Sequence, residues 1–256
     1  MIRKTVALGV AVLGLLASAG TPAAAADAAE LWAAATIAPA RQGLVEVTGY
    51  TGPALGEGSR LTLTAPRGAR ITEAPLDAPG HRGTVDADGD SATYTNTGPA
   101  DGETWREGTF PFVLDVAPDA VPGTRLTGCT ARLTDARGTR AAHGTCTVTV
   151  GLPEPTLTRP EPRLPPAARP EIAGTAYPGA QVTVRHAHVG DGGVTGQGPE
   201  PGAEVCAATA RADGAWSCQP ALALPGGPGR LQATASLNGV SAVSEQRFVA
   251  VGAAGR

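Results

Sequence analysis

Lysine, aromatic residues and long apolar segments are all scarce in this chain. Lys4 is its only lysine, and Phe, Trp and Tyr contribute three residues each. After residue 26 no apolar stretch approaches the roughly 20 residues that a membrane-spanning helix needs, so the mature protein is expected to have no membrane span. The lysine-poor composition, rich in Gly and Pro, is typical of a GC-rich genome such as that of an actinobacterium.

Basic blocks and the motifs of the common catalytic classes are also missing. The net charge is −3, and arginines are interspersed with acidic residues along the chain. This distribution argues against nucleic acid or an anionic membrane surface as a partner. No G-x-S-x-G, H-E-x-x-H or phosphate-binding loop occurs. We therefore predict that the protein is not an enzyme and has no cofactor.

The first residues have the pattern of a secretory signal peptide. Arg3 and Lys4 precede an apolar run at 5–19, and the small residues Ala24 and Ala26 suit a signal peptidase. The run is too short to anchor the chain as a spanning helix. We predict cleavage after Ala26 and secretion of the mature protein.

All four cysteines lie in the exported part of the chain, where an even number is typical of disulfides. Three pairings are possible. The local one, Cys129 with Cys146 and Cys206 with Cys218, is favoured because each pair brackets its own hairpin. Each closed loop would stabilise the fold by about 3 kcal/mol in the chain-entropy model. A zinc site is disfavoured because no C-x-x-C pair occurs.

Short strand patterns recur throughout the mature chain, and sustained helical periodicity is absent. At 146–150, for example, apolar residues alternate with threonine, as in a strand with one buried face. The predicted fold is all-β, with two antiparallel Ig-like β-sandwich domains after the cleaved signal peptide. The Cys-Trp-Cys spacing of antibody domains is absent, which leaves the topology of the N-terminal sandwich open.

Pro153-Glu154-Pro155 marks a boundary between the two domains. The predicted division is a signal peptide at 1–26, an N-terminal β-sandwich domain at 27–152, a second domain at 153–252 and a C-terminal tail at 253–256.

From 154 to 251 the chain resembles the bacterial Ig-like domains repeated in adhesins and other exported proteins. The resemblance lies in PTLTRP at 155–160, RPEIAGTAYPGAQVTV at 169–184 and CAATARADGAWSC at 206–218. It implies a β-sandwich used as a spacer or adhesive module without catalysis. The long Gly-rich segment at 190–204 departs from the family, either as a binding loop or as a tolerated insertion.

Trp216 is predicted to anchor the core of the second domain. Asp213-Gly214 predicts a tight hairpin, and beyond it Trp216 and Cys218 fall on one face. A domain this poor in aromatic residues needs its Trp in the core.

Three further groups are candidates for binding. Trp105 lies among charged residues, either as a core residue or as an exposed aromatic group. His186 and His188 share one face of a strand, where we expect partly exposed, unmetallated histidines, with a ligand or metal pair as the alternative.

Asp86, Asp88 and Asp90 have the spacing of the first three ligands of a calcium loop. However, Gly89 stands at the fourth position instead of the sixth, and Thr97 replaces the final Glu. We expect an Asp-Gly turn, with a weak surface calcium site as the alternative.

Together these features predict a secreted, non-catalytic Ig-like module for binding, adhesion or structure. Its partner would be an extracellular protein or a cell-surface glycan. A polysaccharide-binding protein is the chief alternative, and the scarcity of spare aromatic residues counts against it. A secreted enzyme of unrecognised type is a second alternative.

Overall fold

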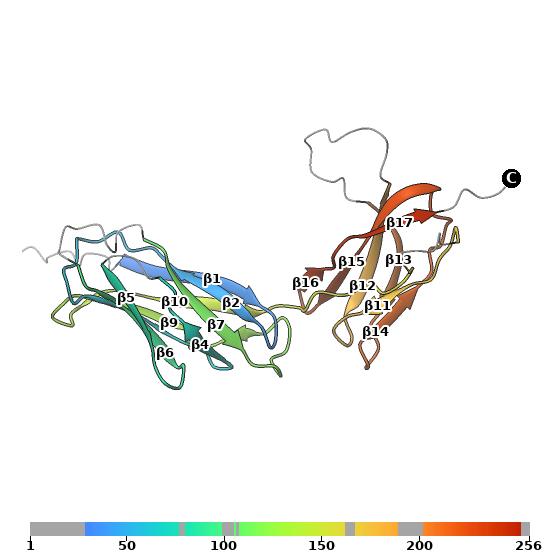
Figure 1. Ribbon diagram of the computed structural model, residues 1–256. Coiled ribbons are helices and arrows are strands. Elements are labelled where there is room, and N and C mark those ends of the chain that lie inside the picture. Colours follow the sequence, from blue (N-terminus) through green and yellow to red (C-terminus); the bar gives the residue numbers. More distant parts are fainter. Residues whose placement is uncertain are drawn as a thin grey trace, which may run out of the picture.

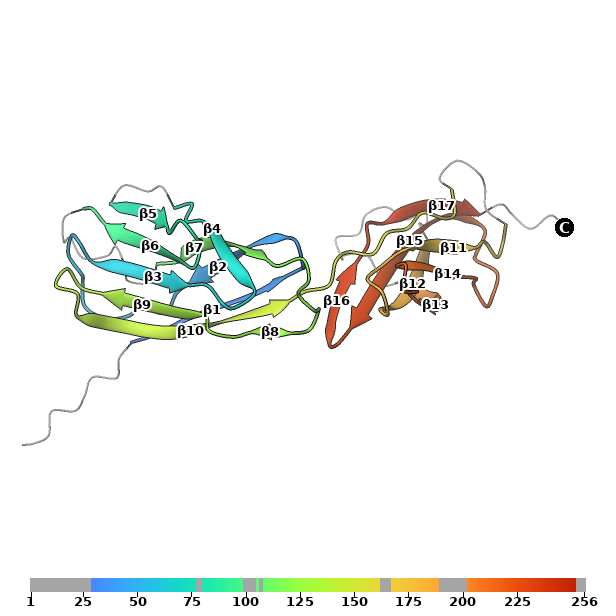
Figure 2. The ribbon, with the colours of Figure 1, turned by 90° about the horizontal axis from the view of Figure 1, so that it is seen from below.

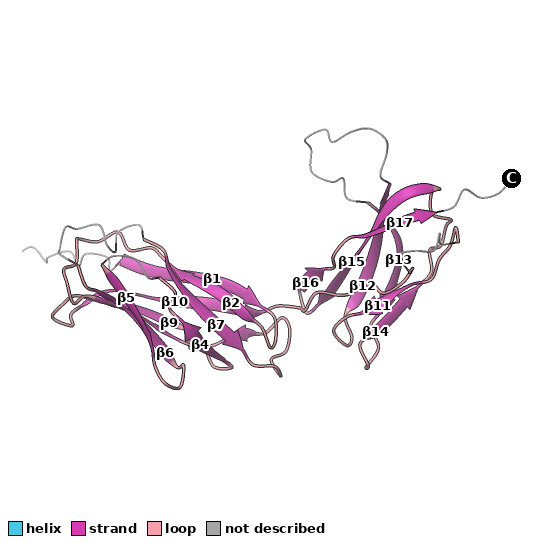
Figure 3. Cartoon of the chain, viewed as in Figure 1, coloured by secondary structure: helices cyan, strands magenta, loops and turns pink. Residues whose placement is uncertain are grey.

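The computed structural model describes residues 29–76, 80–98, 105, 108–161, 167–188 and 202–251. These residues form seventeen strands and no helix (Figures 1 and 3), which confirms the all-β class. In this part of the chain no helix is long and apolar enough to cross a membrane. The predicted signal peptide, the C-terminal tail and most of the 190–204 segment lie outside the described residues.

The first ten strands form what we call the N-terminal sandwich. They are Ala29–Ile37 (β1), Gln42–Val47 (β2), Arg60–Thr64 (β3), Ala69–Glu73 (β4), His81–Val85 (β5), Ser91–Asn96 (β6), Phe110–Val116 (β7), Arg125–Leu126 (β8), Thr130–Thr134 (β9) and Arg140–Val150 (β10). One sheet has seven strands in the order β1-β10-β9-β3-β6-β5, with β8 beside β10 (Figure 2), and the other has the order β2-β7-β4. All pairs are antiparallel except β1 and β10, which pair in parallel over nine residue pairs.

The core of this sandwich follows from alternation along its strands. In β7, Phe110, Phe112, Leu114 and Val116 face inward, and the Tyr94 ring of β6 packs against Phe112 at 5.0 Å. Because side chains alternate between the two faces of a strand, the residues between these apolar positions point to solvent.

Trp105 completes this core. Its side chain is buried, it lies 4.8 Å from the Phe110 ring, and its Nε1 donates a hydrogen bond to Ser59 Oγ at 2.6 Å. The alternative of an exposed aromatic group at this position is therefore wrong.

The remaining strands form what we call the C-terminal sandwich. They are Ile172–Thr175 (β11), Gln181–His188 (β12), Ala203–Thr209 (β13), Ala215–Cys218 (β14), Gly227–Leu237 (β15), Val240–Val243 (β16) and Arg247–Val251 (β17). A sheet in the order β13-β12-β15-β16, with β17 beside β15, faces the pair β11-β14. The backbone amides of Thr156 and Thr158 donate hydrogen bonds to Thr175 and Ala173 of β11, so residues 155–160 form a first extended segment of this sandwich.

Disulfides join the two predicted pairs, Cys129 to Cys146 and Cys206 to Cys218. The first bridge joins Cys129, the residue before β9, to Cys146 of the neighbouring antiparallel strand β10. The second was expected to bracket a paired hairpin, and that expectation is wrong. Strands β13 and β14 belong to different sheets. The turn at Asp213-Gly214 carries the chain from one sheet to the other, and the bridge therefore fastens the two layers together.

The two sandwiches lie end to end (Figure 1), and core membership changes within three residues. Val150 packs in the first core and Leu152 in the second. The turn between β15 and β16 also reaches the first sandwich, because Asn238 Nδ2 donates a hydrogen bond to the Pro122 carbonyl oxygen at 3.0 Å. The change from the first core to the second therefore falls at Gly151, next to the boundary predicted at Pro153.

Candidate functional site

The outer face of the seven-stranded sheet is covered by polar side chains aligned in rows across the strands. The central row contains Glu30, His143, Arg132, Thr62, Thr93 and Thr84. The row on one side contains Arg140, Thr134, Arg60, Thr95 and Arg82. The row on the other side contains Trp32, Thr145, Thr130, Thr64 and Ser91. We call these three rows the polar face.

Local sequence explains why these residues point outward. Strands β3 (RLTLT), β6 (SATYTN) and β9 (TARLT) alternate apolar residues, which are buried, with threonine, serine or arginine. Threonine suits such strands because its branched side chain is stiff and packs well on a pleated surface. The hydroxyl groups of Thr62 and Thr93, for example, lie 2.9 Å apart across two strands.

A hollow of ≈ 730 Å³ opens on the polar face over strands β1, β10, β9 and β3. Its walls are formed by Glu30, Thr62, Thr64, Thr130, Ala131, Arg132, Arg140, His143, Gly144 and Thr145. Guanidinium, imidazole, carboxylate and hydroxyl groups therefore converge on one open, solvent-accessible depression. Such a surface can hydrogen-bond a polar ligand.

The arginines of the polar face are not neutralised within the described part of the chain. The three salt bridges found there are Arg70–Asp115, Arg159–Glu171 and Arg211–Asp213, and none of them lies on this face.

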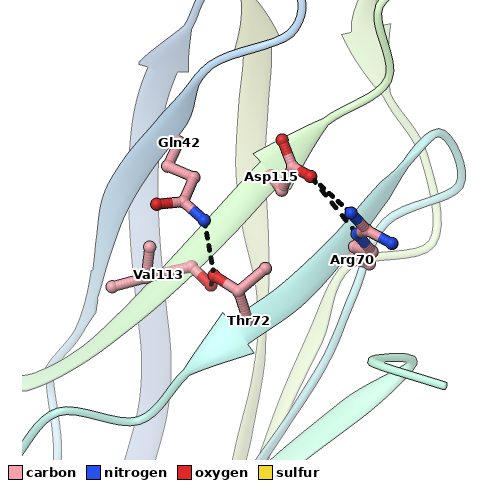
Figure 4. A network of polar contacts seen from close by, with 5 residues as sticks. All are labelled: Gln42, Arg70, Thr72, Val113 and Asp115. Carbon is pink, nitrogen blue, oxygen red and sulfur yellow. Dashed lines mark hydrogen bonds and ion pairs between the residues drawn. The ribbon is translucent and has the colours of Figure 1, made fainter. Parts of the chain in front are cut away.

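The opposite outer face, on the β2-β7-β4 sheet, contrasts with it (Figure 4). There the Arg70 guanidinium is held 3.0 Å from the Asp115 carboxylate, and the Gln42 amide donates to the Thr72 hydroxyl. The Arg70 guanidinium is therefore paired with a carboxylate, whereas the guanidinium groups of the polar face have no salt-bridge partner among the described residues.

Trp32, at the margin of the polar face, was missed by the sequence reasoning. It pairs in register with Thr145, and 58% of its side chain is exposed. Its indole lies over Gly49, where an added Cβ would come within 3.0 Å of Cδ1. The alternation of buried Leu31 and Ala33 around it was the signal that could have placed Trp32 outward.

The two histidines of β12 differ in their exposure. His188 is exposed, but His186 is buried, which contradicts the expected partial exposure. Burial lowers the pKa of His186, and the nearby His188 lowers it further. No group of three potential metal-ligating side chains occurs among the residues that the structure describes.

Asp86, Asp88 and Asp90 form the tight turn between β5 and β6. The Gly89 amide donates to the Asp86 carbonyl oxygen, and the Asp90 amide donates to Asp88 Oδ1 at 3.1 Å. The Ser91 hydroxyl donates to the Asp86 carboxylate. Two of the three carboxylates are thus used within the turn, which favours the plain Asp-Gly turn over a calcium site.

A larger hollow, of ≈ 1230 Å³, lies where the chain passes from one sandwich to the other. The connecting segment 151–157 forms much of its wall, together with residues of β16 and β17. Its walls come from both sandwiches and from the segment that connects them, whereas the polar face is built on one continuous sheet. We therefore place the candidate site on the polar face.

Comparisons with known proteins give no family. No family model and no curated protein matches the chain. Among solved structures, the third cohesin of ScaC from Acetivibrio cellulolyticus is 12% identical, covering 47% of this chain and 98% of its own, with a TM-score of 0.33. BcpA, the major pilin subunit of Bacillus cereus, is 11% identical, covering 86% of this chain and 65% of its own, with a TM-score of 0.33.

A putative membrane-anchored protein from Corynebacterium diphtheriae is 12% identical, with a TM-score of 0.28. The alignment covers 87% of this chain and 53% of that one, so the chain spans about half of that protein.

Proposed function

We propose that the chain is a non-catalytic extracellular module that binds its ligand on the polar face. The observation that carries this proposal is the 730 Å³ hollow, whose walls include Arg132 and Arg140 without a salt-bridge partner among the described residues. A ligand can pair with these groups without breaking internal bonds. Two disulfides support an extracellular location, because such bridges persist in oxidising compartments.

A role in binding suits this site better than a role in catalysis. The hollow is an open depression on the face of a sheet, whereas catalytic groups act most strongly in sites from which water is excluded. The rigid sheet also holds the binding groups in place before a ligand arrives, which lowers the entropy lost on binding.

Polysaccharide is the ligand class that one observation favours over protein. Trp32 offers an exposed indole next to Thr145, and threonine hydroxyls continue across four further strands. An indole can stack on the apolar face of a sugar ring while hydroxyl groups bond to its rim. The centre of a protein–protein interface, in contrast, is enriched in aromatic residues and depleted in charge.

Retention of the secreted protein on purified cell-wall glycan, chitin, cellulose and intact cells tests the proposal. The double variant Arg132→Ala/His143→Ala should lose retention and keep the melting temperature of the wild type, because both side chains are exposed. Arg185→Ala, on an exposed position of β12, is the matched control and should behave as the wild type. Equal retention of all three proteins would disprove the polar face as the binding site.

A further inference from the structure

Three of the four arginines of the polar face recur at a fixed interval. Arg140 on β10, Arg60 on β3 and Arg82 on β5 occupy every second strand of one row, and Thr134 and Thr95 occupy the strands between them. Neighbouring strands are separated by about 4.8 Å, so successive arginines stand roughly 10 Å apart at their backbones. We call this line of five residues the arginine row.

The polar face is also cationic on a protein that is acidic as a whole. Four arginines share the three rows with a single carboxylate, that of Glu30 at the margin, while the complete chain has a net charge of −3. Charge of one sign gathered on one face raises the local concentration of ligands of the opposite sign.

We propose that the polar face binds a linear acidic polysaccharide, which lies across the strands and places carboxylate-bearing sugars on the arginine row. This inference rests on the proposed function and specifies its ligand. The guanidinium group suits a carboxylate because its planar fork can donate two parallel hydrogen bonds. The hydroxyl groups of Thr134 and Thr95 stand between the arginines, where the ligand has uncharged ring hydroxyls to pair with.

The spacing of the arginines favours a polymer of low charge density. Duplex DNA carries one negative charge per roughly 1.7 Å of its axis, far denser than cations set roughly 10 Å apart. A polysaccharide with an acidic group on some of its sugars matches such sparse cations more closely. The arginine row also contains no aromatic residue on which nucleobases could stack.

Affinity electrophoresis in gels that contain hyaluronan, which carries a carboxylate on every second sugar, tests the inference, with fully methyl-esterified hyaluronan as the neutral matched polymer. The wild-type protein should be retarded by the acidic polymer far more than by the ester, and retardation should fall as salt screens the charges. Arg60→Gln and Arg82→Gln should each weaken binding about tenfold, since a charge-assisted hydrogen bond is lost. Arg70→Gln, on the opposite face, is the control and should bind as the wild type.

Each other outcome overturns the inference and can be told apart from failure of the proposed function. Equal binding of the acid and the ester would show that charge is not recognised, while the polar face could still hold a neutral glycan. Absence of binding to polygalacturonate, hyaluronan and alginate, or tighter binding to duplex DNA than to any of them, would exclude an acidic polysaccharide. Loss of binding in Arg70→Gln equal to that in Arg60→Gln would remove the arginine row from the site.

Discussion

Trp216 lies directly opposite Gly174 in the pair β11-β14. A Cβ added at Gly174 would come within 2.9 Å of the indole Cζ2 and would also strike the Thr156 carbonyl oxygen. The missing side chain thus leaves room for the indole on one side and for the extended segment at 155–160 on the other. The largest side chain of this core is accommodated by the smallest residue of the neighbouring strand.

Trp216→Ala should destabilise the C-terminal sandwich by about 3–5 kcal/mol, the usual cost of removing a buried aromatic side chain. The side chain is 3% exposed in a core otherwise made of small and aliphatic residues. Urea unfolding followed by circular dichroism measures the change. A loss below about 1 kcal/mol, together with loss of ligand binding, would instead assign Trp216 to a binding site.

The stability of the C-terminal sandwich should decrease in mildly acidic solution because of His186. Burial lowers the folded-state pKa of His186 below its ordinary value of 6.5, so the folded protein favours the neutral ring. The neutral His186 ring contributes fully to the free energy of unfolding above about pH 6.5. This stabilisation is lost as the pH falls through the folded-state pKa, because the unfolded chain binds the proton more readily than the folded protein. Melting temperatures between pH 8 and pH 5 measure it.

The variant His186→Leu should reduce this decrease in melting temperature, because it removes the buried titrating group. His188→Gln, on the exposed end of the same strand, is the control and should retain most of the decrease. If the melting temperature of His186→Leu fell as much as that of the wild type between pH 8 and pH 5, a titrating group other than His186 would cause the decrease.

Peptide mapping of the non-reduced, secreted protein should recover the linked pairs Cys129–Cys146 and Cys206–Cys218. Reduction should lower the melting temperature of the C-terminal sandwich in particular, because its disulfide joins two sheets that face each other. Thermal unfolding with and without reductant measures the effect. Free thiols in the native protein, or a link between the two sandwiches, would contradict this arrangement.

Fragments 27–151 and 152–256 should each unfold cooperatively, because each contains one of the two core clusters in full. Their melting temperatures should lie close to those of the corresponding transitions in the whole protein. Differential scanning calorimetry of both fragments and of the whole chain provides the comparison. A fragment that stays unfolded would show that the two sandwiches depend on each other for folding.

Local patterns were sufficient to predict the class of the fold. The alternation at 146–150 predicted a strand with one buried face, and Cys146, Val148 and Val150 do face the core. The Asp-Gly turn at Asp88-Gly89 was found for the same reason, since its hydrogen bonds join residues close in sequence.

The polar face was beyond such reasoning because it depends on strand register. Arg60, Arg82, Arg132 and Arg140 stand in four different strands, and only the pairing of those strands brings them together. The sequence, lacking a basic block, predicted no clustering of cations. The step from one sheet to the other between β13 and β14 was missed likewise, because a turn sequence does not specify which partners its strands find.

The parallel pairing of β1 with β10 determines how the N-terminal sandwich carries a mechanical load. Tension along the protein enters this sandwich at the start of β1 and leaves at the end of β10, where the chain continues into the C-terminal sandwich. Because the strands are parallel, the two forces act along them in opposite directions and slide one past the other. All nine residue pairs from Ala29↔Ala142 to Ile37↔Val150 resist together, whereas an antiparallel hairpin pulled at its open end peels apart one pair at a time.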